Sequence, residues 1–200
     1  MHPAADFRHG DRQLHETLID QVGFGMIFAQ TPDGPRVAHT PMVSTGDGAV
    51  QFHLSAGNGL TKHLAGINTL ALVNGPDAYV SARCYDQPDQ VPTWNYVALE
   101  PEGTVRRIEP EGLIALLHQL SERHEGRIKE GEPWTMDKLS PARLAGLVKG
   151  IVGFEMEIKA WRDTVKLSQN KSAEQREREA AGLNAEGSPA IAQLMRDLVP

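Results

Sequence analysis

The sequence predicts an α+β protein built on an antiparallel split β-barrel, with helices at the periphery of the barrel. Two observations lead to this prediction. Short runs of alternating apolar and polar residues come first, and glycine- or proline-containing turns separate them. The clearest helical patterns come late, and no strand–helix–strand alternation recurs, so a parallel sheet does not fit the order of elements.

The first third of the chain is expected to form one helix and three antiparallel strands. The helix runs from Asp11, a suitable N-cap, to about Val22, and Gly23 is a natural stop. Short turns such as Asp33-Gly34 favour antiparallel pairing of the strands that follow. These strands are expected to span residues 24–30, 36–44 and 50–55.

Proline and glycine pairs predict two turns in the middle of the chain. Gly75-Pro76 is expected to separate two strands, and Glu100-Pro101-Glu102-Gly103 is expected to be the turn of a hairpin. The four strands around these turns are expected to span residues 69–74, 77–82, 94–100 and 103–108.

The second half is expected to contain four helices and one strand. Pro110 opens an amphipathic helix with a leucine stripe that ends at Gly126, and Ser140-Pro141 opens another with Leu144, Leu147 and Val148 facing inward. Residues 152–160 alternate as a strand with one polar face. The charged run 172–182 is typical of a solvated helix, and a last apolar helix follows residues 187–189.

Length and composition are consistent with one domain and a short appendage. The chain has 200 residues, 40% of them hydrophobic. We expect a barrel domain over residues 1–171, with inserted helices over 110–149, and a C-terminal helical tail over 172–200. The apolar stripe of that tail needs a surface to cover, either on the barrel or on a partner chain.

Several functional classes are excluded or disfavoured. No run of eighteen apolar residues, no signal-peptide pattern and only one cysteine, Cys84, predict a soluble cytoplasmic protein. The net charge of −6 and pI near 5.7 argue against a broad nucleic-acid surface. No zinc spacing and no Walker or Rossmann glycine loop is present, so no metal site is expected.

Two short motifs concentrate unusual chemistry. Val91-Pro92-Thr93-Trp94-Asn95-Tyr96 combines aromatic rings with hydroxyl and amide groups, which suits a flat polar ring. Lys166-Leu167-Ser168-Gln169-Asn170-Lys171 combines ammonium, hydroxyl and amide groups, which suits a phosphate or a polyol chain. The alternative interpretation is that Trp94 and Tyr96 belong to the core and that the second motif is a turn.

A third candidate follows the strand over 50–55. Its polar face, His53 and Ser55, leads to Asn58, which is expected to cap a short helix containing Lys62. Helix N-termini bind phosphate through free N–H groups and the helix dipole. The plainer interpretation is a strand with a wet face followed by a capped helix.

Other polar residues give weaker signals. His39 and Thr40 could place a ring and a hydroxyl near the same spot, although a lone strand histidine is usually structural. His124 suits the C-terminus of its helix. Cys84 has no evident base beside it, and no Ser-His-Asp pattern stands out.

The two six-residue motifs, in this order, resemble the PaiB family of FMN-binding split-barrel proteins, whose members are described as negative transcriptional regulators. Ala38-His39-Thr40-Pro41, the His53…Asn58 loop and Gly75-Pro76 with Ala78-Tyr79-Val80-Ser81 also resemble segments of that family, and the resemblance covers about residues 1–171. The chain departs from the family pattern at Ser55-Ala56-Gly57, where a small residue and a cation are usual.

The resemblance implies a homodimer with the flavin-reductase and PNP-oxidase-like fold and one non-covalently bound FMN per interface site. It implies three groups of cofactor-binding residues. The first group would lie near the phosphate and ribityl chain of FMN and comprises His53, Ser55, Asn58 and Lys62. His39 and Thr40 would flank it. The flavin ring would be bordered, from the same or the partner chain, by Thr93, Trp94, Asn95 and Tyr96. The site would be closed by Lys166, Ser168, Gln169 and Asn170.

Three functions remain open at this point. A flavoprotein could pass a hydride from NAD(P)H to an acceptor, with the flavin doing the chemistry, so catalytic residues stay unassigned. A regulator could act through DNA or protein contacts without flavin turnover, and the acidic charge makes direct DNA binding the weaker form of this idea. A haem-binding split barrel could draw an axial ligand from His39, His53, His63 or His124.

Overall fold

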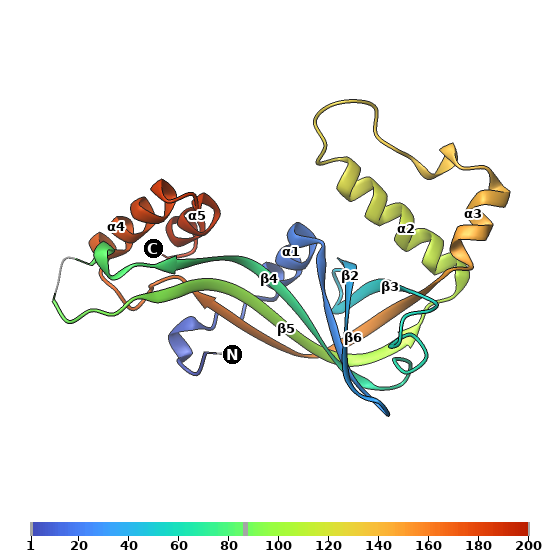
Figure 1. Cartoon of the computed structure of the whole chain (residues 1–200), viewed down its shortest axis with the longest axis horizontal. Coiled ribbons are helices and arrows are strands. Elements are labelled where there is room, and N and C mark those ends of the chain that lie inside the picture. The colour runs from blue at the N-terminus through green and yellow to red at the C-terminus, as the bar shows by residue number, and fades with distance from the viewer. Residues whose placement is uncertain (1, 86–87, 200) are drawn as a thin grey trace. The chain divides into compact units, whose positions relative to one another are not determined.

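The computed structural model describes residues 2–85 and 88–199. Met1 and Pro200, which bound the two domains expected from the sequence, lie outside the described residues. The strands of the described chain are β1 (Phe24–Thr31), β2 (Gly34–Ser44), β3 (Ala49–Ser55), β4 (Asn68–Val80), β5 (Thr93–Arg107) and β6 (Ile151–Lys166). Its α-helices are α1 (Arg12–Val22), α2 (Pro110–Glu125), α3 (Pro141–Val148), α4 (Ala173–Ala185) and α5 (Pro189–Asp197), all drawn in Figure 1.

The chain divides into two compact units. The first unit comprises Met1–Asp11, Asn74–Leu99 and Arg162–Pro200, and the second unit comprises Arg12–Val73 and Glu100–Trp161. The long strands β4, β5 and β6 contribute residues to both units. The first unit also contains α4 and α5, whereas α1, α2 and α3 belong to the second.

The strands close a barrel in the order β1-β2-β3-β6-β5-β4. Pairing is antiparallel where β1 meets β2 and β4 and where β3 meets β2 and β6. Alternation along β3 points Phe52 into the second unit, where it stacks on Phe154 of β6 with ring centroids 5.5 Å apart. Both rings are fully buried. The predicted α+β antiparallel barrel is therefore confirmed, as are the three strands expected first.

Two predicted turns are wrong, because β4 and β5 are each one continuous strand. Gly75-Pro76 lies inside β4, and Pro101 and Gly103 lie inside β5. At Gly103 a Cβ atom would lie 1.9 Å from the carbonyl oxygen of Glu157. Gly103 is therefore explained by the close passage of another backbone, and not by a turn.

The helices of the second unit follow the predicted pattern with one exception. Gly23 ends α1 with φ +67°, and its N–H donates to the carbonyl oxygen of Ile19. The leucine stripe of α2 is buried at Leu113, Leu116 and Leu120. The expected inward face of α3 is wrong: that helix buries no residue, and Leu147 is 45% exposed.

The C-terminal helices of the first unit are less solvated than the charge run predicts. Ser172 caps α4 by accepting a hydrogen bond from the Gln175 N–H, as its residue type favours. The buried face of α4 lies toward α5 and the short 3-10 turn Ala82–Cys84, and Figure 1 shows α4 and α5 side by side. That face buries Gln175, Glu179, Ala180 and Leu183. Across residues 2–85 and 88–199, no helix is both long and apolar enough to span a lipid bilayer.

Candidate functional site

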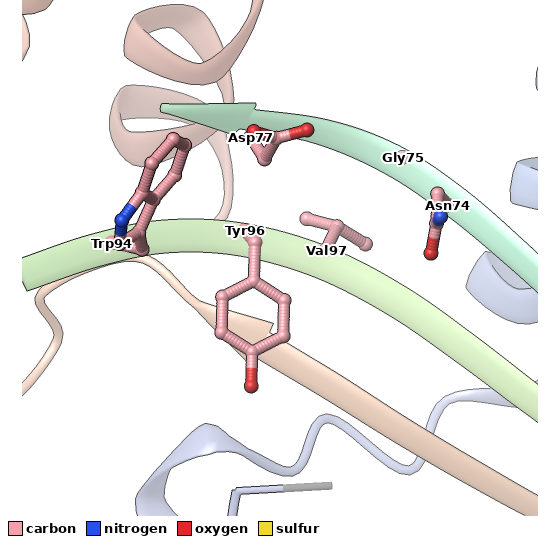
Figure 2. Close-up of a pocket in the computed structure, with 6 residues that line it drawn as sticks. All are labelled: Asn74, Gly75, Asp77, Trp94, Tyr96 and Val97. Carbon is pink, nitrogen blue, oxygen red and sulfur yellow. The ribbon is translucent and has the colours of Figure 1, made fainter. Parts of the chain in front are cut away.

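A pocket of about 350 Å³ lies against β4 and β5 within the first unit. Figure 2 shows the residues that line it, which come from facing stretches of the two strands. They are Asn74, Gly75, Asp77, Trp94, Tyr96 and Val97. The lining combines two aromatic rings, an aliphatic side chain, an amide and a carboxylate. Such a mixture of apolar wall and few polar groups is typical of a small-molecule site.

Strand alternation explains why the pocket is aromatic. Along β5, the buried Asn95 alternates with the more exposed Trp94 and Tyr96, so both aromatic residues lie on the face of the strand opposite to Asn95. Trp94 remains 53% exposed and meets Tyr79 of β4 edge-to-face, with ring centroids 6.0 Å apart. Tyr79 is itself 48% exposed. Two half-exposed aromatic rings beside a pocket are an unusual apolar surface for a chain to leave uncovered.

The two sequence motifs meet in the first unit. The Lys166 ammonium donates hydrogen bonds to Thr93 Oγ1 at 2.7 Å and to the carbonyl oxygen of Trp94 at 2.5 Å. It also lies 5.7 Å from the ring centroid of Phe7. Burial lowers the pKa of Lys166, the Glu179 carboxylate opposes that effect, and the charge of Lys171 adds to it. Lys166 therefore anchors the backbone that presents Trp94.

Behind the aromatic strand, Asn95 and Ser168 form a buried polar pair. Asn95 Nδ2 donates to Ser168 Oγ at 2.9 Å and lies 3.4 Å from Met195 Sδ of α5. Ser168 adopts φ +60°, a conformation that few non-glycine residues take. Gln169 is turned toward its own backbone, accepting from the Leu167 N–H and donating to the Val165 carbonyl oxygen. Asn170, by contrast, is exposed.

The other six predicted residues lie in the second unit, on β2, on β3 and in the loop that follows β3. Thr40 is buried and donates its hydroxyl to the carbonyl oxygen of His53 at 2.6 Å. His53 Nδ1 is buried and has no hydrogen-bond partner among the described residues, and burial lowers the pKa of this imidazole. His39, Ser55 and Lys62 are exposed.

The short helix predicted after Asn58 is wrong, because residues 56–63 form turns. Asn58 Oδ1 still accepts from the Leu60 N–H, the local bond that makes asparagine a good cap, and Thr61 Oγ1 donates to the Ser55 carbonyl oxygen. These side-chain bonds close the turns without a helix. The helix-dipole argument for a phosphate at this loop therefore no longer applies.

The sequence did not single out four pocket residues, namely Asn74, Gly75, Asp77 and Val97. The signal that could have found them is the Gly75-Pro76 segment, which was noted for its family resemblance but interpreted as a turn. Because β4 runs through this segment, Asn74 and Asp77 lie on the strand that runs beside the part of β5 with Trp94 and Tyr96 (Figure 2).

The six-stranded antiparallel barrel with peripheral helices is the architecture of the split-barrel class. A family described as "Putative FMN-binding domain" matches residues 1–160, and the chain belongs to that family. "Protease synthase and sporulation protein PAI 2" of Bacillus subtilis (strain 168) is 28% identical over 187 residues, covering 90% of this chain and 89% of the relative. The resemblance to the PaiB family is thereby confirmed.

Solved structures share the fold at low identity. The FAD and heme binding protein from Mycobacterium smegmatis has a TM-score of 0.62 and 18% identity, covering 88% of this chain and 80% of that one. The flavocytochrome Anf3 from Azotobacter vinelandii has a TM-score of 0.63 and 14% identity, covering 83% and 72%. At these identities the likeness shows the fold alone.

Proposed function

We propose that the chain binds FMN non-covalently in a homodimer and that the flavin ring lies against the β4–β5 pocket. The observation that carries the proposal is the half-exposed Trp94 ring beside a pocket of about 350 Å³, in a member of an FMN-binding family. An exposed aromatic ring leaves apolar area in contact with water. A flat heterocyclic ligand stacked on the ring, or a partner chain, would bury that area.

The pocket residues fit an isoalloxazine ring. Trp94, Tyr96 and Val97 supply an apolar wall, and the Asn74 amide can donate to or accept from the polar edge of the ring. The Asp77 carboxylate can accept from a ring N–H, but it would repel a phosphate. We therefore assign this pocket to the ring end of FMN and not to its phosphate end.

The proposal assigns the remaining predicted residues by their surroundings. Lys166, through its bonds to Thr93 and Trp94, and the pair Asn95 and Ser168 support the ring-binding strand, while Gln169 and Asn170 belong to the turn that closes it. For His39, Thr40, His53, Ser55, Asn58 and Lys62, which lie in the second unit, contact with the phosphate and ribityl chain of FMN stays the prediction that the family resemblance gives. Lys62, as the exposed cation of that set, is the proposed phosphate contact.

Bound FMN would supply hydride-transfer chemistry, and we propose NAD(P)H as its reductant. The protein's part is to bind the ring, to orient it and to exclude water from one of its faces. Mixing purified FMN-loaded protein with NADH or NADPH and a dye acceptor tests this. Reduction of the acceptor above the rate of free FMN supports turnover, and a rate equal to that of free FMN rejects it.

The experiment that tests FMN binding is a titration of the purified protein with FMN, followed by flavin absorbance and fluorescence. Structured flavin bands with quenched fluorescence, saturating at one FMN per chain, are the expected result. Added FMN that stays fully fluorescent at micromolar protein would reject the proposal.

A cytoplasmic location remains an expectation from the single cysteine.

The homodimer is part of the proposal because Trp94 and Tyr79 leave apolar area that a second copy would cover. Light scattering during size-exclusion chromatography should give twice the chain mass of 21.9 kDa. A monomer in the presence of saturating FMN would contradict the dimer.

Haem binding is the second candidate, and His53 favours it. Burial lowers the pKa of its imidazole and so favours the neutral form, the form in which histidine ligates a metal, and its Nδ1 has no partner among the described residues. A Soret band that appears with added hemin and is lost in His53→Ala would support this candidate. Unchanged hemin spectra would remove it.

A further inference from the structure

Glu179, on the buried face of α4, is a fully buried carboxyl group. Its side chain is 0% exposed, and neither carboxylate oxygen has a hydrogen-bond partner among residues 2–85 and 88–199. One turn earlier on the same face, the Gln175 amide Nε2 is also buried without a partner there. Buried carboxylates are ordinarily paired, because leaving one unpaired in a dry interior is costly.

Cations lie near Glu179, but each is committed elsewhere. Lys166 donates to Thr93 and Trp94, Lys171 donates to Gln90 Oε1 at 3.0 Å, and Arg176 donates to the Lys171 carbonyl oxygen at 2.9 Å. The Ser168 hydroxyl, which donates to Asn95, lowers the pKa of Glu179 most, and the charges of Lys171, Lys166 and Arg176 lower it further. Burial is the larger influence, and it raises the pKa of Glu179 above its ordinary value.

Groups of the 3-10 turn and of the β6 end also act on or respond to Glu179. The Cys84 thiol and the Tyr85 phenol both have their pKa raised, first by burial and then by negative charge that includes Glu179. On the α5 side, Arg196 is held at the surface by Glu177, with Nη2 2.7 Å from Oε1. Among the described residues, the charged and titratable groups that act on Glu179 or share its surroundings are Cys84, Tyr85, Lys166, Lys171 and Arg176, with Glu186 beside Cys84.

We propose that Glu179 is a pH-sensitive switch that sets how tightly α4 and α5 pack behind the strand that carries Trp94. Burial in the packed state favours the neutral carboxyl, and ionisation of Glu179 favours an opened state in which water reaches α4. The link to the pocket is direct within the first unit: Met195 of α5 contacts Asn95, which lies between Trp94 and Tyr96 on β5.

The direction of the pH dependence follows from linkage. The pKa of Glu179 is raised in the packed state. At pH values between the ordinary glutamate pKa, about 4.3, and this raised pKa, the packed state therefore binds more protons than the open state. Packing is therefore tightest at acidic pH and weakens as pH rises through this window. Each unit by which the pKa is raised increases opening tenfold across the window.

The test is hydrogen exchange of backbone amides in residues 173–199, corrected for the intrinsic effect of pH, at pH 5 and pH 8. We expect wild-type protection to fall about tenfold or more from pH 5 to pH 8. Glu179→Gln, which is neutral at both pH values, should keep its pH 5 protection within about twofold. The control Glu174→Gln changes an exposed glutamate on the same helix and should behave as wild type.

Two results would overturn the proposal. One is pH-independent protection in the wild type; the other is an equal loss of protection at both pH values in Glu179→Gln, which would mean that a charged carboxylate is needed for packing. If Glu179→Gln does not fold, a carbon-13 NMR titration of the wild-type glutamate carboxyls decides the matter. One carboxyl titrating above the others supports the switch, and all titrating together at the ordinary value rejects it.

Discussion

The Lys166 ammonium is hydrogen-bonded to the carbonyl oxygen of Trp94, and this bond joins the two sequence motifs that carry the family resemblance. The residues lie far apart in the chain, yet one bond fixes the backbone from which the exposed indole projects. Lys166 also donates to Thr93 Oγ1, so its ammonium group holds the strand that carries Trp94 in position.

Removing that ammonium should loosen the strand. Lys166→Met keeps the aliphatic length but loses two charge-assisted hydrogen bonds, and we expect a loss of about 1.5–3 kcal/mol in the free energy of unfolding. Urea denaturation followed by circular dichroism measures it. Lys159→Met, at an exposed position of the same strand, is the control and should change stability by less than about 0.5 kcal/mol. Equal losses in both variants would contradict the anchoring role.

The buried pair Asn95 and Ser168 should show energetic coupling. Asn95→Ala leaves the Ser168 hydroxyl without its partner in a dry environment, so we expect a loss of about 1–3 kcal/mol. In a double-mutant cycle with Ser168→Ala, the coupling energy should be about 0.5–3 kcal/mol. Strict additivity of the two single changes would mean that the pair does not stabilise the first unit.

A glycine pair tests the continuous β5. Gly103→Ala would place a Cβ 1.9 Å from the Glu157 carbonyl oxygen, so it should cost about 3 kcal/mol or more in stability. Gly146→Ala, inside α3 with open space around it, should instead stabilise by about 0.5–1 kcal/mol. If residues 100–103 formed a turn in solution, Gly103→Ala would be nearly neutral in the same urea experiment.

His53 should make stability fall in mild acid. Burial lowers its pKa in the folded chain, so the unfolded chain binds the proton more readily, and stability is lost as pH falls below about 6.5. His53→Gln should reduce this loss, as judged from urea midpoints at pH 5 and pH 7.5. His39→Gln, at an exposed position on β2, should leave the wild-type loss in place. If the His53→Gln protein loses as much stability at pH 5 as wild type does, the acid sensitivity does not come from His53.

Local patterns predicted the barrel strands β1 to β3 and the helices α1, α2, α4 and α5 with small errors at their ends. The failures have one physical cause. Pro101 and Gly103 satisfy the chemistry of a turn, but Gly103 is needed where two backbones pass close together, a contact between residues far apart in sequence. Alternation likewise predicts which residues share a face, but not whether another element covers that face, and so α3 was assigned a buried side that it lacks.

The candidate site shows the same limit. Trp94 and Tyr96 could be chosen from the sequence because aromatic residues beside amides suit a planar ligand. Asn74 and Asp77 could not, because they reach the pocket only through the pairing of β4 with β5, which no local pattern encodes. The roles of the residues around His53 and the division of the chain into domains at residue 171 stay predictions.

The most direct test of the central claim is the FMN dissociation constant of Trp94→Ala, measured by fluorescence quenching beside wild type and Trp134→Ala. Trp134 is a partly exposed tryptophan of the second unit, so it controls for the loss of an indole. Loss of aromatic stacking should weaken FMN binding by about 1–2 kcal/mol, or about 5- to 30-fold, in Trp94→Ala only. An unchanged dissociation constant in Trp94→Ala would show that the flavin does not bind at the β4–β5 pocket.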